Sequence, residues 1–197
     1  MDSCNVVLVG VGGQGILLAA EILGTAAVKE GYNVRVSELH GMAQRGGAVI
    51  SHVRIGEKAL APTLLEGTAD IIVGFEPMEA LRNIRFASQK TTVLLNVKPF
   101  AISGARYPEV EEILEQIRGF TKNVISFDAA MLAKKTGIVM TQNTVMIGAL
   151  AATGKVPISV DNLKAALGVL IRTEYFDANV KAFELGYSTV NSLARSK

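Results

Sequence analysis

The segment VLVGVGGQGILLAAEIL, residues 7–23, restricts the possible folds of this chain more than any other part of it. Residues 5–9 form a short, mostly apolar run, which is typical of a parallel strand buried on both faces. A glycine-rich turn follows at 10–15, and residues 16–29 have helical periodicity, with Gly31 placed to end the helix. Because 33–38 then alternates as a strand does, the sequence predicts a β-α-β unit.

The order of the remaining elements predicts a Rossmann-like doubly wound α/β fold. Its mostly parallel sheet would carry helices on both faces, with a helical C-terminal third in one domain, 1–197. Residues 48–55 alternate and are expected to form a strand exposed on one face. The apolar stripe of 176–195 leaves open whether that helix packs on its own domain or on a neighbour. The other expected strands are 69–75, 92–97 and 124–127, and the other helices begin at Pro77 and span 108–118, 128–136, 142–152 and 159–172.

Composition excludes several classes of protein. The mean hydropathy of +0.33 is high, yet no apolar run reaches the length of a membrane-spanning helix, so an interface with another subunit is expected to bury the excess. A net charge of +2 without blocks of either sign gives no footprint for nucleic acid or a membrane surface. The N-terminus has no signal-peptide pattern, and a cytoplasmic location is expected.

Cysteine and histidine are too scarce for metal chemistry in this chain. Cys4 is the only cysteine, so neither an intrachain disulfide nor a four-thiolate iron–sulfur cluster is available, and Cys4 is expected to be a core residue. Two histidines, His40 and His52, are too few for a histidine-based zinc site without carboxylate ligands. Any metal or cluster would therefore be held by another chain.

The glycine turn satisfies the G-x-G-x-x-G pattern, in which glycines let the backbone approach a phosphate at a helix N-terminus. Gly12, Gly13, Gln14 and Gly15 are the candidate ligand-facing residues. Glu38, at the end of the second expected strand, stands where a dinucleotide-binding domain has its ribose-binding acid. The alternative is that the glycines only permit close packing of helix on strand.

A second unusual segment, SELHGMAQRGG at 37–47, follows that strand. Its arginine is a fork donor suited to a carboxylate or phosphate, and its glycines allow exposed backbone amides. Loops beyond the carboxyl ends of parallel strands are where α/β domains bind ligands, although a plain surface loop is the alternative. The candidate residues are His40, Gly41, Met42, Gln44, Arg45, Gly46 and Gly47.

Two polar residues elsewhere join the candidate site. Glu76 closes a strand at the same edge of the sheet, where its carboxylate would face the glycine turn, pair with Arg45 or cap the next helix. Asn143 stands at the start of a helix near Thr144 and is expected to be its N-cap.

These residues together resemble a known family. GVGGQGILLAAEILGTAA, SELHGMAQRGGAVISHVRIG and ADIIVGFEPMEALR are similar to the gamma-type subunit of 2-oxoacid:acceptor oxidoreductases, and HGMAQRGG at 40–47 favours the indolepyruvate branch. The resemblance covers most of the chain. It implies an oxygen-sensitive complex that decarboxylates a 2-oxo acid on thiamine diphosphate, reduces ferredoxin through iron–sulfur clusters and forms an acyl-coenzyme A.

Within that family, this chain would be an accessory subunit that is inactive alone. Thiamine diphosphate, magnesium and the clusters are expected in the large catalytic subunit, because this chain lacks their motifs. The chain alone is expected to bind no cofactor. The glycine turn and 40–47 would form one surface near the partner's active site, with Arg45 toward coenzyme A phosphates. Two alternatives stay open: a stand-alone NAD-dependent oxidoreductase, and an assembly subunit without any ligand.

Overall fold

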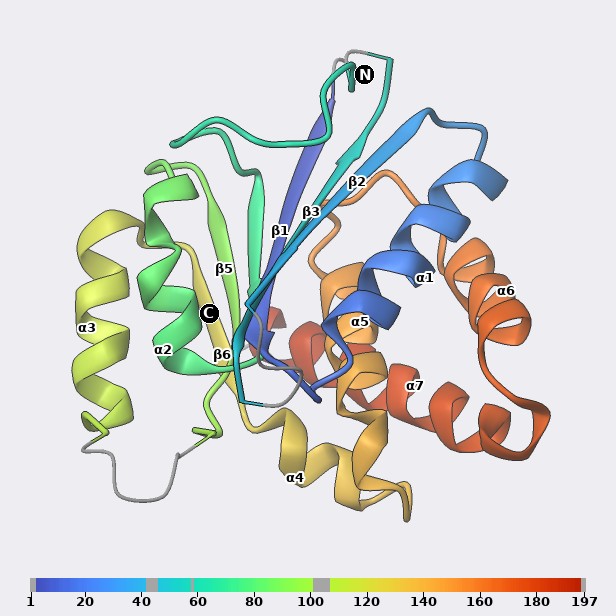
Figure 1. Cartoon of the computed structure of the whole chain (residues 1–197). Coiled ribbons are helices and arrows are strands. Elements are labelled where there is room, and N and C mark those ends of the chain that lie inside the picture. The colour runs from blue at the N-terminus through green and yellow to red at the C-terminus, as the bar shows by residue number, and fades with distance from the viewer. Residues whose placement is uncertain (1–2, 42–45, 58, 101–106, 196–197) are drawn as a thin grey trace.

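A computed structural model gives the fold, a six-stranded mixed sheet, and describes residues 3–41, 46–57, 59–100 and 107–195 (Figure 1). The order of the strands across the sheet is β2-β3-β1-β4-β5-β6. The strands are β1 (Cys4–Val11), β2 (Val34–His40), β3 (Ala48–Ile55), β4 (Ile71–Gly74), β5 (Thr92–Asn96) and β6 (Val124–Phe127). Four of them, β1, β4, β5 and β6, pair in parallel as the sequence predicts.

The β-α-β unit predicted at the N-terminus is modified by β3. β3 pairs antiparallel with β1 on one side and antiparallel with β2 on the other. β2 therefore runs in the direction of β1 but lies two strands away from it, at the edge of the sheet. An ordinary dinucleotide-binding order would place these two strands side by side.

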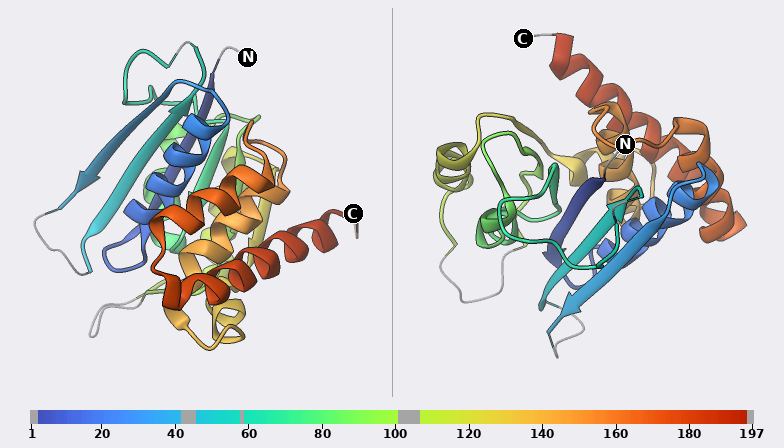
Figure 2. Two further views of the ribbon diagram at one scale, coloured as in Figure 1. Left: turned by 90° about the vertical axis from the view of Figure 1, so that its right-hand side faces the viewer. Right: turned by 90° about the horizontal axis from the view of Figure 1, so that it is seen from above.

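Helices cover both faces of the sheet, as the sequence predicts. Val6 and Leu8 of β1 belong to the core on one face of the sheet, which includes residues of α1, α4, α5, α6 and α7, while Val7 and Val9 belong to the core on the other face, which includes residues of α2 and α3 (Figures 1 and 2). The continuous apolar run thus forms a strand buried on both sides. The helices are α1 (Ile16–Lys29), α2 (Pro77–Arg82), α3 (Val110–Phe120), α4 (Ala129–Lys134), α5 (Gln142–Ala152), α6 (Val160–Leu170) and α7 (Thr173–Arg195), with short 3₁₀ helices at Ile84–Phe86 and Val139–Thr141.

The prediction that residues 48–55 are exposed on one face is wrong. His52, on the face expected to be open, is only 3% exposed, and its ring meets Phe86 edge-on. The chain after β3 folds back over this face: the Leu64 N–H donates to His52 Nδ1 at 3.2 Å, and Arg54 Nη1 donates to the Ala61 carbonyl at 2.9 Å. Alternation identified the two faces of the strand, but it carries no information on a loop that covers one of them.

The C-terminal helix packs on its own domain, against α5. Two glycines make the crossing possible: a Cβ at Gly186 would lie 1.9 Å from the Val145 carbonyl oxygen, and one at Gly148 would lie 2.0 Å from that of Phe183. The two helix backbones are therefore in direct contact. Within the described residues, no helix is both long enough and apolar enough to cross a membrane.

Candidate functional site

The glycine turn after β1 and the end of the 37–47 segment lie side by side. The Gly12 N–H donates to the Gly47 carbonyl at 2.8 Å, and the Gly46 N–H donates to the Gly12 carbonyl at 3.3 Å. These bonds continue the β1–β3 ladder beyond Val11, because β3 begins next to the end of β1. The structure thus brings together two segments that the sequence separates by about thirty residues, at the carboxyl edge of the parallel strands.

Gln14 fixes the shape of the turn and points into the protein. Its Oε1 accepts from the Val11 N–H at 2.8 Å, and its Nε2 donates to the Phe75 carbonyl at 3.1 Å. The side chain therefore joins the ends of β1 and β4. A Cβ at Gly10 would lie 2.6 Å from Gln14 Oε1, so Gly10 provides the space that this bridge needs. Gln14 is a candidate residue whose role in this structure is to hold the turn.

Among the residues that the structure describes, no side chain caps the N-terminus of α1. Gly15 is the N-cap residue with φ 75°, and no acidic residue lies in the first turn of the helix. The first helical hydrogen bond is donated by the Ala19 N–H to the Gly15 carbonyl at 3.0 Å, which leaves the N–H groups of Ile16, Leu17 and Leu18 ahead of it. Helix N–H groups without a partner, as these are within the described part of the chain, attract anions together with the positive end of the helix dipole.

Two hollows flank this turn, and both include Gly13 and Gly15. One, of about 570 Å³, lies toward the 37–47 segment and is lined by Gly12, Leu17, His40 and Gly41 among others. The other, of about 620 Å³, lies toward the C-terminal helices. Gly13 is exposed between them. The second hollow is largely apolar, and the residues that line it besides the two glycines are Leu18, Ile138, Met140, Thr141, Asn143, Leu170, Ile171, Arg172, Tyr175 and Asn179.

Asn143 belongs to the site, but the predicted N-cap role is wrong. The N-cap of α5 is Thr141, and Asn143 lies in the first turn, 3% exposed. Its Nδ2 reaches the Gly15 carbonyl at 3.5 Å, and a Cβ at Gly15 would lie 2.7 Å from that nitrogen. Because α5 begins at Gln142, directly after a 3₁₀ turn, Asn143 already lies inside the helix, and its side chain packs over the glycine turn.

The second hollow is also lined by Asn179, a polar residue that sequence reasoning missed. Thr144 Oγ1 donates to Asn179 Oδ1 at 2.6 Å, and Asn179 Nδ2 donates to the Tyr175 carbonyl at 2.8 Å. Asn179 is 6% exposed although it lies on α7. A polar residue within an apolar helical stripe was the available signal. Its position beside the glycine turn depends on the α5–α7 crossing, which the sequence does not reveal.

Glu76 caps α2, which is one of the three roles considered for it. The carboxylate is 2% exposed; Oε2 accepts from the Glu79 N–H at 2.9 Å, and Oε1 accepts from the Phe100 N–H at 3.3 Å and from the Tyr107 hydroxyl. Burial, followed by the hydrogen bond to Glu76, raises the pKa of Tyr107. All of these bonds are made with α2, Phe100 and Tyr107, so within the described residues the Glu76 carboxylate does not face the glycine turn.

Glu38 and His40 are exposed on β2, the edge strand. Strands in a sheet lie roughly 4.8 Å apart, so the insertion of β3 puts Glu38 about 10 Å from the line of β1 in place of about 5 Å. His40 lines the first hollow, whereas Glu38 lines a separate groove between α1 and β2. The predicted site residues Met42, Gln44 and Arg45 lie outside the described residues.

The family is decided by comparison with known proteins. Residues 5–189 match the model of the pyruvate ferredoxin/flavodoxin oxidoreductase family. The chain belongs to this family. This confirms the resemblance inferred from the glycine turn and the 37–47 segment.

Individual relatives cover nearly the whole chain. A protein of Pyrococcus horikoshii named indolepyruvate oxidoreductase subunit IorB is 42% identical over 199 residues, covering 98% of each chain. The pyruvate/ketoisovalerate oxidoreductases common subunit gamma of Pyrococcus abyssi is 30% identical and covers 88% of this chain and 89% of its own. The 2-oxoglutarate:ferredoxin oxidoreductase of Magnetococcus marinus superposes with a TM-score of 0.74 at 20% identity, over 98% of this chain and 32% of that one. That likeness shows a shared fold, which makes up about a third of the longer Magnetococcus marinus chain.

Proposed function

We propose that this chain is the accessory, gamma-type subunit of an indolepyruvate:ferredoxin oxidoreductase. The complex would oxidatively decarboxylate aryl pyruvates to acyl-coenzyme A and pass the electrons to ferredoxin. The observation that carries the proposal is the identity of 42% over nearly the full length with a subunit named for indolepyruvate, against 30% with a gamma subunit named for pyruvate and ketoisovalerate. The chain alone would be inactive, and the complex would be cytoplasmic.

The proposed contribution of this chain is an anion site at the glycine turn. The uncapped N-terminus of α1, with no acid in its first turn, would bind the phosphates of coenzyme A beside the partner's active site. The hollow lined by Gly12, Gly13, His40 and Gly41 has room for such a group next to these N–H donors. The Arg45 predicted to face the anion lies in the same segment of sequence as His40 and Gly41.

The electron-carrying groups of the reaction do not fit the residues of this chain. An iron–sulfur cluster needs several thiolates, whereas Cys4 is the only cysteine. Its thiol donates to the Lys155 carbonyl at 3.4 Å, and burial, reinforced by the charge of Asp70, raises its pKa to about 12. Thiamine diphosphate, magnesium and clusters are therefore proposed to lie in the large catalytic subunit.

A stand-alone NAD-dependent enzyme is the competing proposal, and the strand order makes it less favourable. Glu38 is on the strand displaced from β1 by β3, so a dinucleotide on the glycine turn would not have its ribose acid at the usual distance. The other alternative, an assembly subunit without any ligand, is distinguished from an anion-binding subunit by a charge substitution at Leu17.

A charge placed in the first turn of α1 tests the anion site. Leu17→Asp adds a carboxylate that favours the helix dipole, so the fold is retained, while it repels an incoming phosphate. In the reconstituted complex, the KM for coenzyme A should rise about tenfold or more relative to Leu17→Asn, which differs by charge alone. Equal KM values in the two variants would favour the assembly subunit without a ligand.

A further inference from the structure

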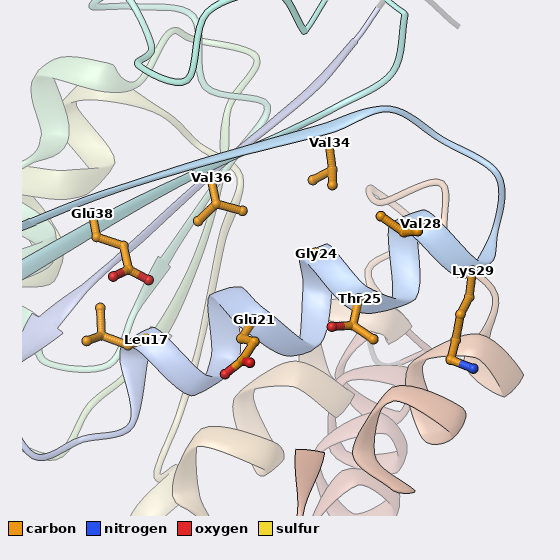
Figure 3. A pocket seen from close by; sticks show the side chains of 9 residues that line it. All are labelled: Leu17, Glu21, Gly24, Thr25, Val28, Lys29, Val34, Val36 and Glu38. Carbon is orange, nitrogen blue, oxygen red and sulfur yellow. The ribbon is translucent and has the colours of Figure 1, made fainter. Parts of the chain in front are cut away.

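The edge strand β2 and helix α1 enclose a groove that is separate from the glycine turn (Figure 3). It has a volume of about 700 Å³. Three side chains of β2 line it, in the order Val34, Val36 and Glu38 along the strand. The helix lines the other side with Leu17, Glu21, Gly24, Thr25, Val28 and Lys29. The groove is therefore bounded by a free edge of the sheet and by one face of a single helix.

Apolar side chains around this groove are exposed. Val28 is 61% exposed, Leu17 41% and Val36 38%. β2 has seven residues and none of them is fully buried, whereas β6, at the other edge of the sheet, has only four residues. A long edge strand with apolar surface can pair with a strand of another chain, and shortness is one protection against such pairing. Of the two edges, β2 is therefore the better suited to pairing.

The register with β3 identifies the backbone groups of β2 that point away from the sheet. The Gly56 N–H donates to the Asn33 carbonyl at 2.8 Å, so the odd-numbered residues of this segment form the hydrogen-bonded pairs with β3. The N–H and C=O groups of the even-numbered residues consequently point outward. The Val34 carbonyl already accepts from Arg35 Nη1 at 3.0 Å, and its oxygen has a second lone pair for another donor.

Charge along the groove is asymmetric. Glu38 and Glu21 lie at the end near Leu17, and Lys29 lies at the other end (Figure 3). Within the described ranges, the side chains of Glu21, Glu38 and Lys29 make no hydrogen bond and no ion pair. A groove with the same charges in the reverse direction would complement this one. A second copy of the chain, turned antiparallel, presents such a groove.

A twofold axis through Val36 places a second copy of β2 antiparallel to the first. Val36 then pairs with its own counterpart, and Val34 of each copy lies opposite Glu38 of the other. These are even-numbered residues, whose N–H and C=O groups point outward, so they form the hydrogen-bonded pairs of the new ladder. The two six-stranded sheets join into one continuous sheet, with both α1 helices on the same face.

The same axis brings opposite charges together. Gly24 lies level with Val36, since a Cβ at Gly24 would be 3.5 Å from Val36 Cγ2. Lys29 follows Gly24 by five residues, which is about 7.5 Å along the helix. Glu38 follows Val36 by two residues, which is about 6.6 Å along the strand in the opposite direction. The axis carries Glu38 of the second copy to the Lys29 end, so the two charges match to within about 1 Å in position along the groove.

Neighbouring registers fit less well. An axis through Arg35 places the two Arg35 side chains directly opposite each other, and an axis through Glu38 does the same with the two carboxylates; like charges in these positions repel. An axis through Ser37 separates Lys29 from Glu38 of the second copy by about 7.5 Å along the groove. The register centred on Val36 is therefore the one that the charges select.

We infer that two copies of this chain pair through β2 as a twofold dimer centred on Val36. Main-chain hydrogen bonds between the two strands supply affinity, and the joined grooves bury apolar surface of both copies. The contacts between Lys29 of one copy and Glu38 of the other fix the register. This pairing is a property of the isolated chain and does not depend on the proposed function.

Charge reversal tests the pairing in the isolated chain by sedimentation velocity, in which the wild type should form a dimer. Lys29→Glu and Glu38→Lys each bring like charges together, so each should raise the Kd of the dimer about tenfold or more. The matched controls Lys181→Glu and Glu115→Lys, at exposed positions of α7 and α3, should leave the Kd unchanged. A mixture of the two groove variants should form the mixed dimer in preference to either homodimer, because each lysine then faces a glutamate.

Several outcomes would overturn the inference. They are a wild-type chain that stays monomeric from micromolar to millimolar concentration, a dimer that both groove variants leave intact, and a mixture without preference for the mixed dimer. If the amides of Val36 and Glu38 gain protection from hydrogen exchange only when the large subunit is added, the occupant is a strand of that subunit and the dimer is excluded.

A proline at the centre of the new ladder tests the backbone pairing separately from the charges. Val36→Pro removes an N–H that points away from β3, so the ladder to β3 is retained while the central pair of the dimer loses both of its hydrogen bonds. Val36→Thr keeps the N–H and the shape of valine and serves as the control. Val36→Pro should be monomeric at concentrations where Val36→Thr is a dimer. Equal dimer contents would contradict pairing through β2, and the charge variants decide the matter if the proline variant does not fold.

Discussion

The contact between α5 and α7 is predicted to be intolerant of a single methyl group. In Gly186→Ala the new Cβ would lie 1.9 Å from the Val145 carbonyl oxygen, while carbon and oxygen normally approach to about 3.3 Å. The helices would have to separate by roughly 1.4 Å, the difference between those two distances. Because the carbonyl belongs to the backbone and the position of a Cβ is fixed by its own backbone, no side-chain rotation can relieve the contact.

The expected free-energy change combines two effects. Overpacking of this kind costs about 3 kcal/mol at the upper end of its usual range, and the better helix propensity of alanine offsets about 1 kcal/mol of it. The net loss of about 2 kcal/mol corresponds to a fall in Tm of roughly 4–8 °C for a chain of this size. Thermal unfolding followed by circular dichroism measures it.

Gly119→Ala is the matched control for this substitution. Gly119 lies in α3, and a Cβ there would meet nothing within 4 Å. Its Tm is expected to stay constant or rise by about 1–3 °C, because only helix propensity changes. A Gly186→Ala protein as stable as Gly119→Ala would refute the conclusion that the two backbones touch at this crossing.

Three other substitutions or treatments have definite expected outcomes. Burial, with the nearby charge of Arg85, lowers the pKa of His52, so on acidification the unfolded chain binds a proton that the folded chain does not. The free energy of unfolding, measured by denaturant titration, should therefore fall as the pH drops below about 6.5. His52→Asn should flatten that part of the pH profile. Gln14→Ala should cost about 1–3 kcal/mol in the same assay, because the Val11 N–H loses its acceptor; an unchanged midpoint would contradict the bridging role of Gln14. Cys4 should resist alkylation at pH 8 in the folded protein and react on unfolding, since its pKa is raised to about 12; rapid modification of the folded chain would contradict its burial.

Local sequence patterns predicted most of the elements and the fold class. The bounds 16–29 and 142–152 match α1 and α5, and Pro77 begins α2 as predicted. Such signals are local: apolar periodicity, a left-handed glycine and a proline at the first helical position. They were sufficient because the same local preferences are satisfied in the packed protein.

The arrangement of the elements was less accessible, because it depends on contacts between distant residues. The alternating residue pattern of β3 is the same whether the strand lies between β1 and β2, as it does here, or at the edge of the sheet. The pattern therefore does not reveal the strand order. The cover over His52 and the α5–α7 crossing depend on a loop and on two glycines whose role appears only when the helices meet. At the site, the glycine turn and its neighbour Gly47 were predicted together, whereas Asn179 was not.

Reconstitution of the complex tests the proposed role most directly. The chain and the large catalytic subunit, expressed together and purified without oxygen, should reduce an electron acceptor with indolepyruvate only when coenzyme A is present, and each chain alone should be inactive. Failure of the two chains to associate, or binding of NAD(H) by this chain alone, would contradict the accessory-subunit role and favour a dinucleotide-binding enzyme.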